Sequence, residues 1–174
     1  MVAVNDACRR IPSADVLYAC DAAWWRFHSG APDFAGERWS THDPVQNDKR
    51  EVASLYGINL VEGRSVRGFS FDPDIIHYGQ NSGFQAVNFA LLSGATTIIL
   101  AGFDMRNTGP KHFFGDHPEP LRNPADFATF TAEFDYASGM LPPGVTIINA
   151  TPDSGLRCFK MMDLDDALSC IPVG

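Results

Sequence analysis

Short continuous apolar runs, closed by polar residues, predict buried strands at four places along the chain. Runs of strand length without a polar alternation are typical of a parallel sheet that is covered on both faces. The four runs are 2–5, 16–20, 96–101 and 145–149. A further short strand is predicted near 38–41, within a region that is rich in Gly, Pro, Asp and aromatic residues.

The segments between these runs carry helical spacing or helix boundary signals. The clearest is 82–94, which begins at Ser82, a suitable N-cap, and ends at Gly94, a suitable helix terminator. Its apolar residues recur at helical spacing. The other predicted helices are 7–11, 22–27, 49–56, 124–140 and 163–170, whereas 63–79 fits no pattern.

Strands that alternate with helices predict an α/β fold. We expect a Rossmann-like, doubly wound and mostly parallel sheet with helices on both faces. A length of 174 residues predicts one domain, 1–174. Such sheets bind ligands at the carboxyl ends of their strands. The polar residues predicted at those ends are Asn5, Asp6, Asp21, Asp104 and Asn149.

The charge balance limits the classes of partner. A net charge of −8, from 13 basic and 21 acidic residues, disfavours nonspecific nucleic-acid binding, which depends on a basic face. It is compatible with a small anionic ligand, because helix N-termini bind anions whatever the net charge. No apolar run approaches the roughly 20 residues that span a bilayer, and no secretory signal is seen. We therefore expect a cytoplasmic protein without membrane or nucleic-acid partners, and homo-oligomerisation is left open.

Cysteines and tryptophans are read mainly as structural residues. None of the four cysteines belongs to a CxxC pair, and in a cytoplasmic chain we expect them to be reduced rather than disulfide-bonded. Trp24 and Trp25 are adjacent in a predicted helix and should point in different directions. We expect one in the core and the other in a groove or against another chain.

Two predicted strand and helix ends carry candidate binding groups. Ser82 and Gly83 open a helix, where unpaired backbone N–H groups, a hydroxyl and close backbone approach suit a phosphate or carboxylate. The alternative is that Ser82 simply caps its helix. Asp104 follows a buried strand, where it could order a loop, hold a ribose hydroxyl or hold a metal.

The densest group of chemically versatile side chains lies in the predicted loop 105–123. It contains His112, Asp116 and His117, together with a lysine and two aromatic residues. Histidine can act as a base near neutral pH, and long loops in compact domains are often functional. The histidines could instead ligate a metal with Asp116, although no HExxH or CxxC motif is present, or be structural loop residues.

Several of these segments together resemble bacterial sialyltransferases that use CMP-sialic acid. Segments 81–94 and 98–104 are similar to a block with a Ser-Gly helix start, an apolar helix, a Gly before the next strand and a Gly-x-Asp after it. The same block resembles archaeal 6-hydroxymethylpterin diphosphokinases. The chain as a whole resembles proteins of bacteriophages and prophages. The sialyltransferases begin with a strand and a Gly-x-Gly-Pro-Ser turn, whereas Met1 falls just before their second strand, which implies an N-terminally truncated domain.

The sialyltransferase resemblance implies a nucleotide-binding, glycosyltransferase-like protein. His117 would be the general base, with His112 as the alternative, because 112–117 is similar to a His-aromatic-x-Gly-His segment of those enzymes. The substrate would be a nucleotide sugar, for example a CMP-linked one, and neither a metal nor a further cofactor is expected. The residues implied to contact the nucleotide are Asn5, Asp21, Ser82, Gly83, Asp104 and Ser154.

Two other functions are kept as alternatives. A pterin diphosphokinase-like enzyme would use ATP and Mg²⁺, with the metal held by carboxylates such as Asp104 and Asp116. A non-catalytic phage protein would retain the fold as a binding or assembly module, in the host cytoplasm, and could pair with another chain through an exposed sheet edge.

Overall fold

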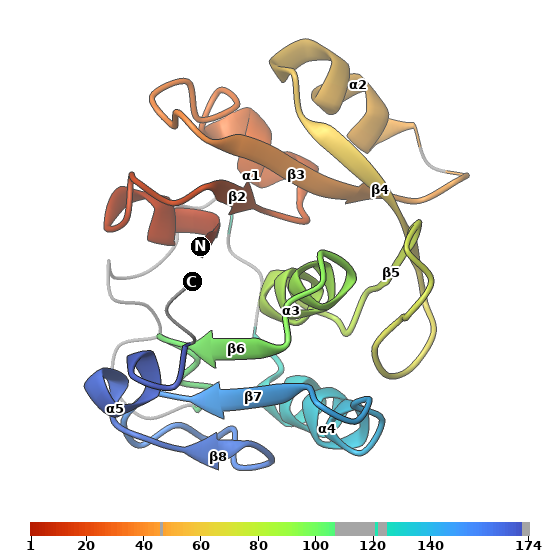
Figure 1. Ribbon diagram of the computed structural model, residues 1–174. Helices are drawn as coiled ribbons and strands as arrows, with labels where there is room; N and C mark the ends of the chain where they lie inside the picture. The colour runs from red at the N-terminus through yellow and green to blue at the C-terminus, as the bar shows by residue number, and fades with distance from the viewer. Residues whose placement is uncertain (46, 107–120, 122–124, 172–174) are drawn as a thin grey trace.

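The computed structural model describes residues 1–45, 47–106, 121 and 125–171, and its α/β class confirms the predicted fold class (Figure 1). All of its strand pairs are parallel. The strands are β1 (Val2–Val4), β2 (Val16–Tyr18), β3 (Glu37–His42), β4 (Asn59–Arg64), β5 (Ile75–His77), β6 (Thr97–Leu100), β7 (Thr146–Asn149) and β8 (Lys160–Met161). The helices are the 3₁₀ helix η1 (Asn5–Arg9) and the α-helices α1 (Ala22–Phe27), α2 (Asp48–Tyr56), α3 (Ser82–Leu92), α4 (Phe127–Ser138) and α5 (Leu164–Leu168).

The strands form two parallel sheets instead of the one that the sequence predicts. One sheet has five strands in the order β1-β2-β3-β4-β5, and the other has three in the order β6-β7-β8. In both sheets the spatial order follows the chain order, so each strand pairs with the next. Since parallel neighbours need a crossover, the connecting helices lie on the faces of the sheets.

Helix α3 packs against both sheets and lies between them (Figure 1). Ala86 and Phe89 contact an apolar cluster around Tyr18 of β2, whereas Phe84 and Val87 contact one that includes β6 and β7 side chains. A helix that buries apolar residues on more than one side belongs in a core. The start of α3 is therefore placed between the polar ends of the strands of two sheets.

The remaining helices complete the cover of the two sheets. Side chains of α1 and α2 share a core cluster with Ala3 and Leu17, on the first two strands. In the smaller sheet, α4 packs with Ile98 and Ile147, while Ala167 of α5 packs with Ile148. Helices thus lie on both faces, as the sequence predicts. No helix in the described part of the chain is both long and apolar enough to cross a bilayer.

Two local predictions are wrong. The N-cap of α3 is Asn81, whose Oδ1 accepts a hydrogen bond from Phe84 N at 2.8 Å, so Ser82 is the first helical residue. Trp24 and Trp25 are both buried, with 4% and 1% of their surface exposed, so neither lines a groove. Their rings pack edge to face at 5.0 Å, and each indole N–H finds a buried acceptor. All four cysteines are free thiols, as expected.

Candidate functional site

Polar residues follow the strands at the carboxyl edge of the sheets, where α/β proteins bind ligands. Asn5 directly follows β1, which pairs with β2 up to Val4 and Tyr18. Asp21 is the N-cap residue of α1, three residues beyond β2, and its side chain is exposed. Asp104 follows β6 and is also exposed. Asn5 and Asp21 lie at the same edge of the five-stranded sheet because β1 and β2 are parallel, and Asp104 lies at the carboxyl end of β6 in the three-stranded sheet.

Ser82 joins the start of α3 to the end of β2. Its buried Oγ accepts a hydrogen bond from Cys20 N at 3.1 Å and donates one to Cys20 Sγ at 3.0 Å. Burial, reinforced by the charge of Asp21, raises the pKa of Cys20 to about 12. Cys20 is therefore a neutral hydrogen-bond partner at physiological pH and is unsuited to nucleophilic chemistry. The contact places Ser82 one residue away from Asp21.

Gly83 joins the same helix start to the loop after β6. A Cβ atom at this position would lie 2.9 Å from Phe103 Cε1 and 3.1 Å from Asn81 Oδ1, closer than normal packing allows. Gly83 therefore lets the Phe103 ring approach the backbone of α3. Since Asp104 is the next residue, the first turn of α3 lies beside the ends of both β2 and β6.

Ser154 has a structural role in the loop after β7. Its Oγ donates a hydrogen bond to Phe103 O at 2.5 Å and accepts one from Leu156 N at 3.0 Å. The next residue, Gly155, donates its N–H to Asp104 O at 2.7 Å. These bonds fasten the loops after β6 and β7 to each other, and they occupy the only hydroxyl hydrogen of Ser154.

Asn5 combines an unusual backbone conformation with an unsatisfied side-chain acceptor. Its φ of 50° lies in the left-handed region, which residues other than glycine seldom adopt. Its buried Oδ1 atom has no hydrogen-bond partner among the described residues. Buried polar atoms nearly always have partners, so this acceptor is suited to a donor group on a ligand. The next residue, Asp6, is buried and accepts a hydrogen bond from Trp24 Nε1 at 3.1 Å.

A buried polar network beneath the helix start was missed by the sequence analysis. Gln85 Oε1 accepts hydrogen bonds from Tyr18 OH at 3.1 Å and from Thr41 Oγ1 at 3.0 Å, and its Nε2 donates to Tyr78 O at 3.0 Å. Lys49 Nζ lies 3.3 Å from the same Thr41 hydroxyl. A glutamine one turn into a mostly apolar helix was the available signal, because buried amides need partners.

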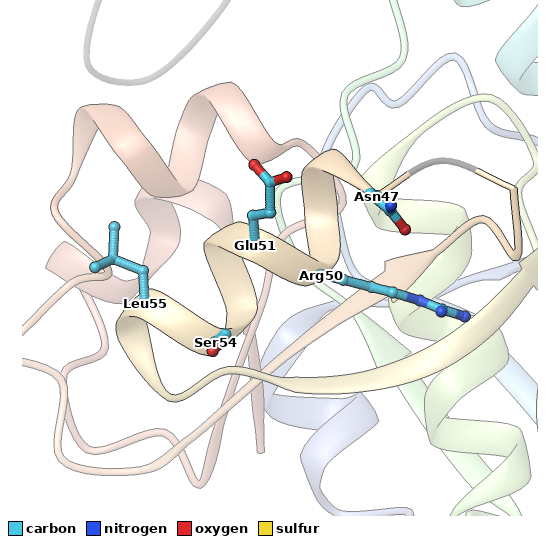
Figure 2. Close-up of a pocket in the computed structure, with 5 residues that line it drawn as sticks. All are labelled: Asn47, Arg50, Glu51, Ser54 and Leu55. Atoms are coloured by element: carbon cyan, nitrogen blue, oxygen red, sulfur yellow. The ribbon is translucent and has the colours of Figure 1, made fainter.

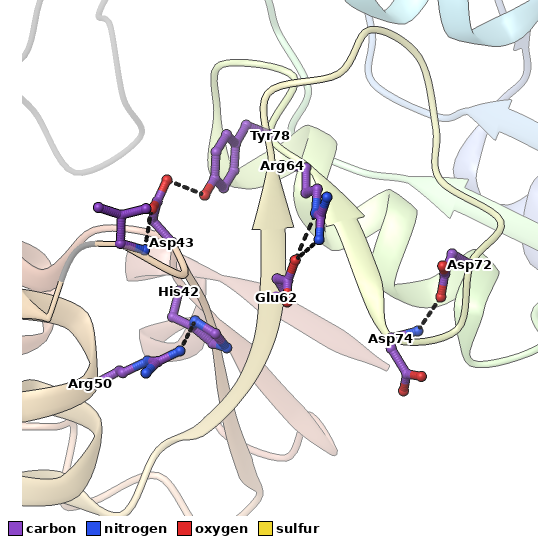
Figure 3. Close-up of polar contacts among 9 residues, drawn as sticks. His42, Asp43, Arg50, Glu62, Arg64, Asp72, Asp74 and Tyr78 are labelled. Atoms are coloured by element: carbon purple, nitrogen blue, oxygen red, sulfur yellow. Dashed lines mark hydrogen bonds and ion pairs between the residues drawn. The ribbon is translucent and has the colours of Figure 1, made fainter.

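Tyr78 links this network to the surface at the end of β5. Its hydroxyl donates to Asp43 Oδ2 at 3.4 Å, as Figure 3 shows. Burial, together with the negative charge of Asp43, raises the pKa of Tyr78 to about 12, so the phenol stays protonated at neutral pH. Gly63 on β4 leaves room for the ring, because a Cβ atom there would collide with it. Tyr78 is therefore unsuited to act as a base at the β5 end of the edge.

Two depressions on the surface lie away from this edge. The larger, of about 540 Å³, is lined by residues of α2 and the position before it, and Figure 2 shows them along a single helix: Asn47, Arg50, Glu51, Ser54 and Leu55. The other, of about 490 Å³, lies at the amino ends of β2 and β3, the opposite edge from Ser82. Neither is lined by a residue that the sequence analysis selected.

The predicted catalytic residues His117 and His112 lie outside the described residues, and so does Asp116. Their predicted roles therefore stay predictions. Within the described ranges, no three His, Cys, Asp or Glu side chains come close enough together to hold a metal ion.

Comparison of the chain with protein-family models, curated proteins and solved structures finds no match.

Proposed function

We propose that this chain binds a nucleotide or nucleotide sugar at the carboxyl edge of its two sheets. One observation carries the proposal: Ser82 and Gly83, which begin α3, contact the segments that follow β2 and β6. A helix start offers unpaired N–H groups and the positive end of a helix dipole, which suit a phosphate. Strand ends from both sides of the same helix supply polar groups for the rest of the ligand.

The unsatisfied acceptor on Asn5 favours a ligand that carries donors. Ribose hydroxyls and the exocyclic amine of cytosine are such groups, so either would complete the hydrogen bonding of Oδ1. An acceptor-rich ligand such as inorganic phosphate alone would leave this atom unsatisfied. In the proposed complex, Asn5 thus binds a ribose hydroxyl or the base of the nucleotide, and the start of α3 binds its phosphate.

Sugar transfer is a further step of the proposal and rests on the resemblance. A glycosyltransferase of this kind needs a base to deprotonate the acceptor hydroxyl, and His117, or otherwise His112, is proposed for that role. Cys20 and Tyr78, with pKa values of about 12, are unsuited to it. No observation favours the diphosphokinase or the assembly module over nucleotide binding.

Titration calorimetry with CMP, CDP, UDP and GDP tests the proposal. We expect saturable binding of at least one nucleotide. Asn5→Gly should weaken binding at least about tenfold, because glycine tolerates the positive φ while the acceptor is lost. Asn47→Ala, in the depression beside α2, is the matched control and should bind like the wild type. Absence of binding by all four nucleotides would refute the proposal, whereas binding of Mg²⁺-ATP alone would favour the diphosphokinase.

A further inference from the structure

Lys49 carries a positive charge that forms no ion pair with an acidic side chain of the described residues. It lies in the first turn of α2 and is half-buried. Its Nζ contacts the hydroxyl of Thr41 at 3.3 Å and lies 5.9 Å from the centroid of the Tyr78 ring, both of which are neutral. Among the described residues, no carboxylate lies within ion-pair distance of it. This is notable in a chain with 21 acidic residues and 13 basic ones.

The neighbours of Lys49 on the same helix are differently placed. Asp48 forms an ion pair with Arg26, and Arg50 contacts the Nδ1 atom of His42 at 3.3 Å (Figure 3). Those contacts belong to the surface. Lys49 instead points toward Thr41, which is fully buried. Its side chain therefore extends toward the interior at the carboxyl edge.

Hydrogen bonds to described residues use only part of the donor capacity of Lys49. The single hydroxyl hydrogen of Thr41 goes to Gln85 Oε1, so Thr41 accepts from the ammonium group. An ammonium has three hydrogens, and this contact uses one of them. Because Tyr18 and Tyr78 complete the hydrogen bonds of Gln85, the network is satisfied without a further role for Lys49.

The position of Lys49 relates it to the proposed ligand. Thr41, its partner, is bonded to Gln85, which lies one turn after Ser82 on α3. The ammonium group therefore approaches the edge from the β3 side, whereas Asn5 lies at its β1 side. A partly desolvated lysine without a carboxylate partner is suited to bind an anionic oxygen as a point charge.

We propose that Lys49 is a specificity residue that binds the phosphate of the nucleotide, so that the site selects nucleotides over nucleosides. This inference rests on the proposed function and adds a residue to it. The ligand class is a nucleoside monophosphate or a sugar linked through such a phosphate. Removal of the charge should weaken binding of the phosphorylated ligand and leave the nucleoside nearly unaffected.

The test compares CMP with cytidine by calorimetry in the wild type, Lys49→Met, Lys49→Arg and the control Arg50→Met. For Lys49→Met we expect about tenfold weaker CMP binding and a change within about twofold for cytidine. Lys49→Arg should recover part of the CMP affinity, and raising the salt concentration should narrow the difference between wild type and Lys49→Met. Arg50→Met should leave both affinities nearly unchanged.

The outcomes separate this inference from the proposed function. If the wild type binds none of CMP, CDP, UDP and GDP while circular dichroism shows a folded protein, the proposed function fails and the inference falls with it. If the wild type binds CMP and Lys49→Met binds it equally well, only the role of Lys49 is refuted. An equal loss of CMP and cytidine affinity in Lys49→Met would show a structural role for Lys49 and would also overturn the inference.

Discussion

Gln85 allows the sharpest prediction about stability, because one amide satisfies three polar groups beneath the candidate site. Its partners are the hydroxyls of Tyr18 and Thr41, both fully buried, and the carbonyl of Tyr78. Gln85→Leu approximately preserves the volume of the side chain but leaves all three groups without this partner. The substitution therefore isolates hydrogen bonding from packing, since it creates little cavity.

The expected loss follows from the cost of unsatisfied groups. Each buried polar group left without a partner costs about 1–3 kcal/mol, and the Tyr78 carbonyl belongs at the lower end because its residue is partly exposed. We expect Gln85→Leu to lower the free energy of unfolding by about 4 kcal/mol, a large share of the roughly 5–15 kcal/mol of a typical domain. Urea unfolding followed by fluorescence of the buried tryptophans measures it. The control Ser93→Ala, at the exposed C-cap position of the same helix, should change stability by less than about 0.5 kcal/mol.

The effect of Tyr18→Phe on stability should have opposite signs in the wild type and in the Gln85→Leu variant. Tyr18→Phe should destabilise the wild type by about 1 kcal/mol, because it removes a hydrogen bond. In the Gln85→Leu background the same change should stabilise the protein, because it removes a buried hydroxyl that has lost its partner. The reasoning is refuted if Gln85→Leu costs less than about 1 kcal/mol, or if Tyr18→Phe is equally destabilising in both backgrounds.

Three further predictions concern other buried groups. Asn88→Ala should cost about 3 kcal/mol in urea unfolding, because Asn88 bonds Ser70 N, Ser70 O and His77 N; a loss below about 1 kcal/mol would contradict this. Iodoacetamide at pH 8, read by mass spectrometry, should label exposed Cys170 far faster than Cys20, of which only about one part in 10⁴ is ionised. Equal labelling of the two cysteines would refute the burial of Cys20. Because the pKa of Cys20 in the folded state lies above 9.0, the contribution of this thiol to stability should be lost as pH rises from about 9 to about 12.

Four of the five strands that the sequence predicts are short apolar runs, and the fifth, near 38–41, corresponds to the mostly polar β3. Segments 16–20, 96–101 and 145–149 correspond to β2, β6 and β7, since a continuous apolar run needs cover on both faces. Strand β4 has the sequence NLVEGR, with two charged residues and a glycine, and mostly half-buried positions, so no run marks it. Strand β8 has two residues, too few for a pattern, and β5 lies within 63–79, where scattered Gly, Arg and Phe residues give no pattern.

The candidate site was predictable only in part, because its key contacts join distant segments. The polar ends after β1, β2 and β6 follow from apolar runs that stop at a polar residue. That Ser82 bonds Cys20 rather than capping α3 depends on a contact across 62 positions, and Asn81, which also suits an N-cap, takes the cap instead. Lys49 and Tyr78 gave no local signal, since their importance arises from Gln85 and Thr41.

Mapping CMP binding by two-dimensional amide NMR tests the central claim most directly. If the ends of the strands and the start of α3 form the binding site, titration should shift the amide signals of Asn5, Cys20, Ser82 and Gly83 with one common affinity. Signals of Glu51, Ser54 and Leu55, along the depression on α2, should stay in place. Shifts confined to α2, or no shifts with any of CMP, CDP, UDP and GDP at millimolar concentration, would contradict the account.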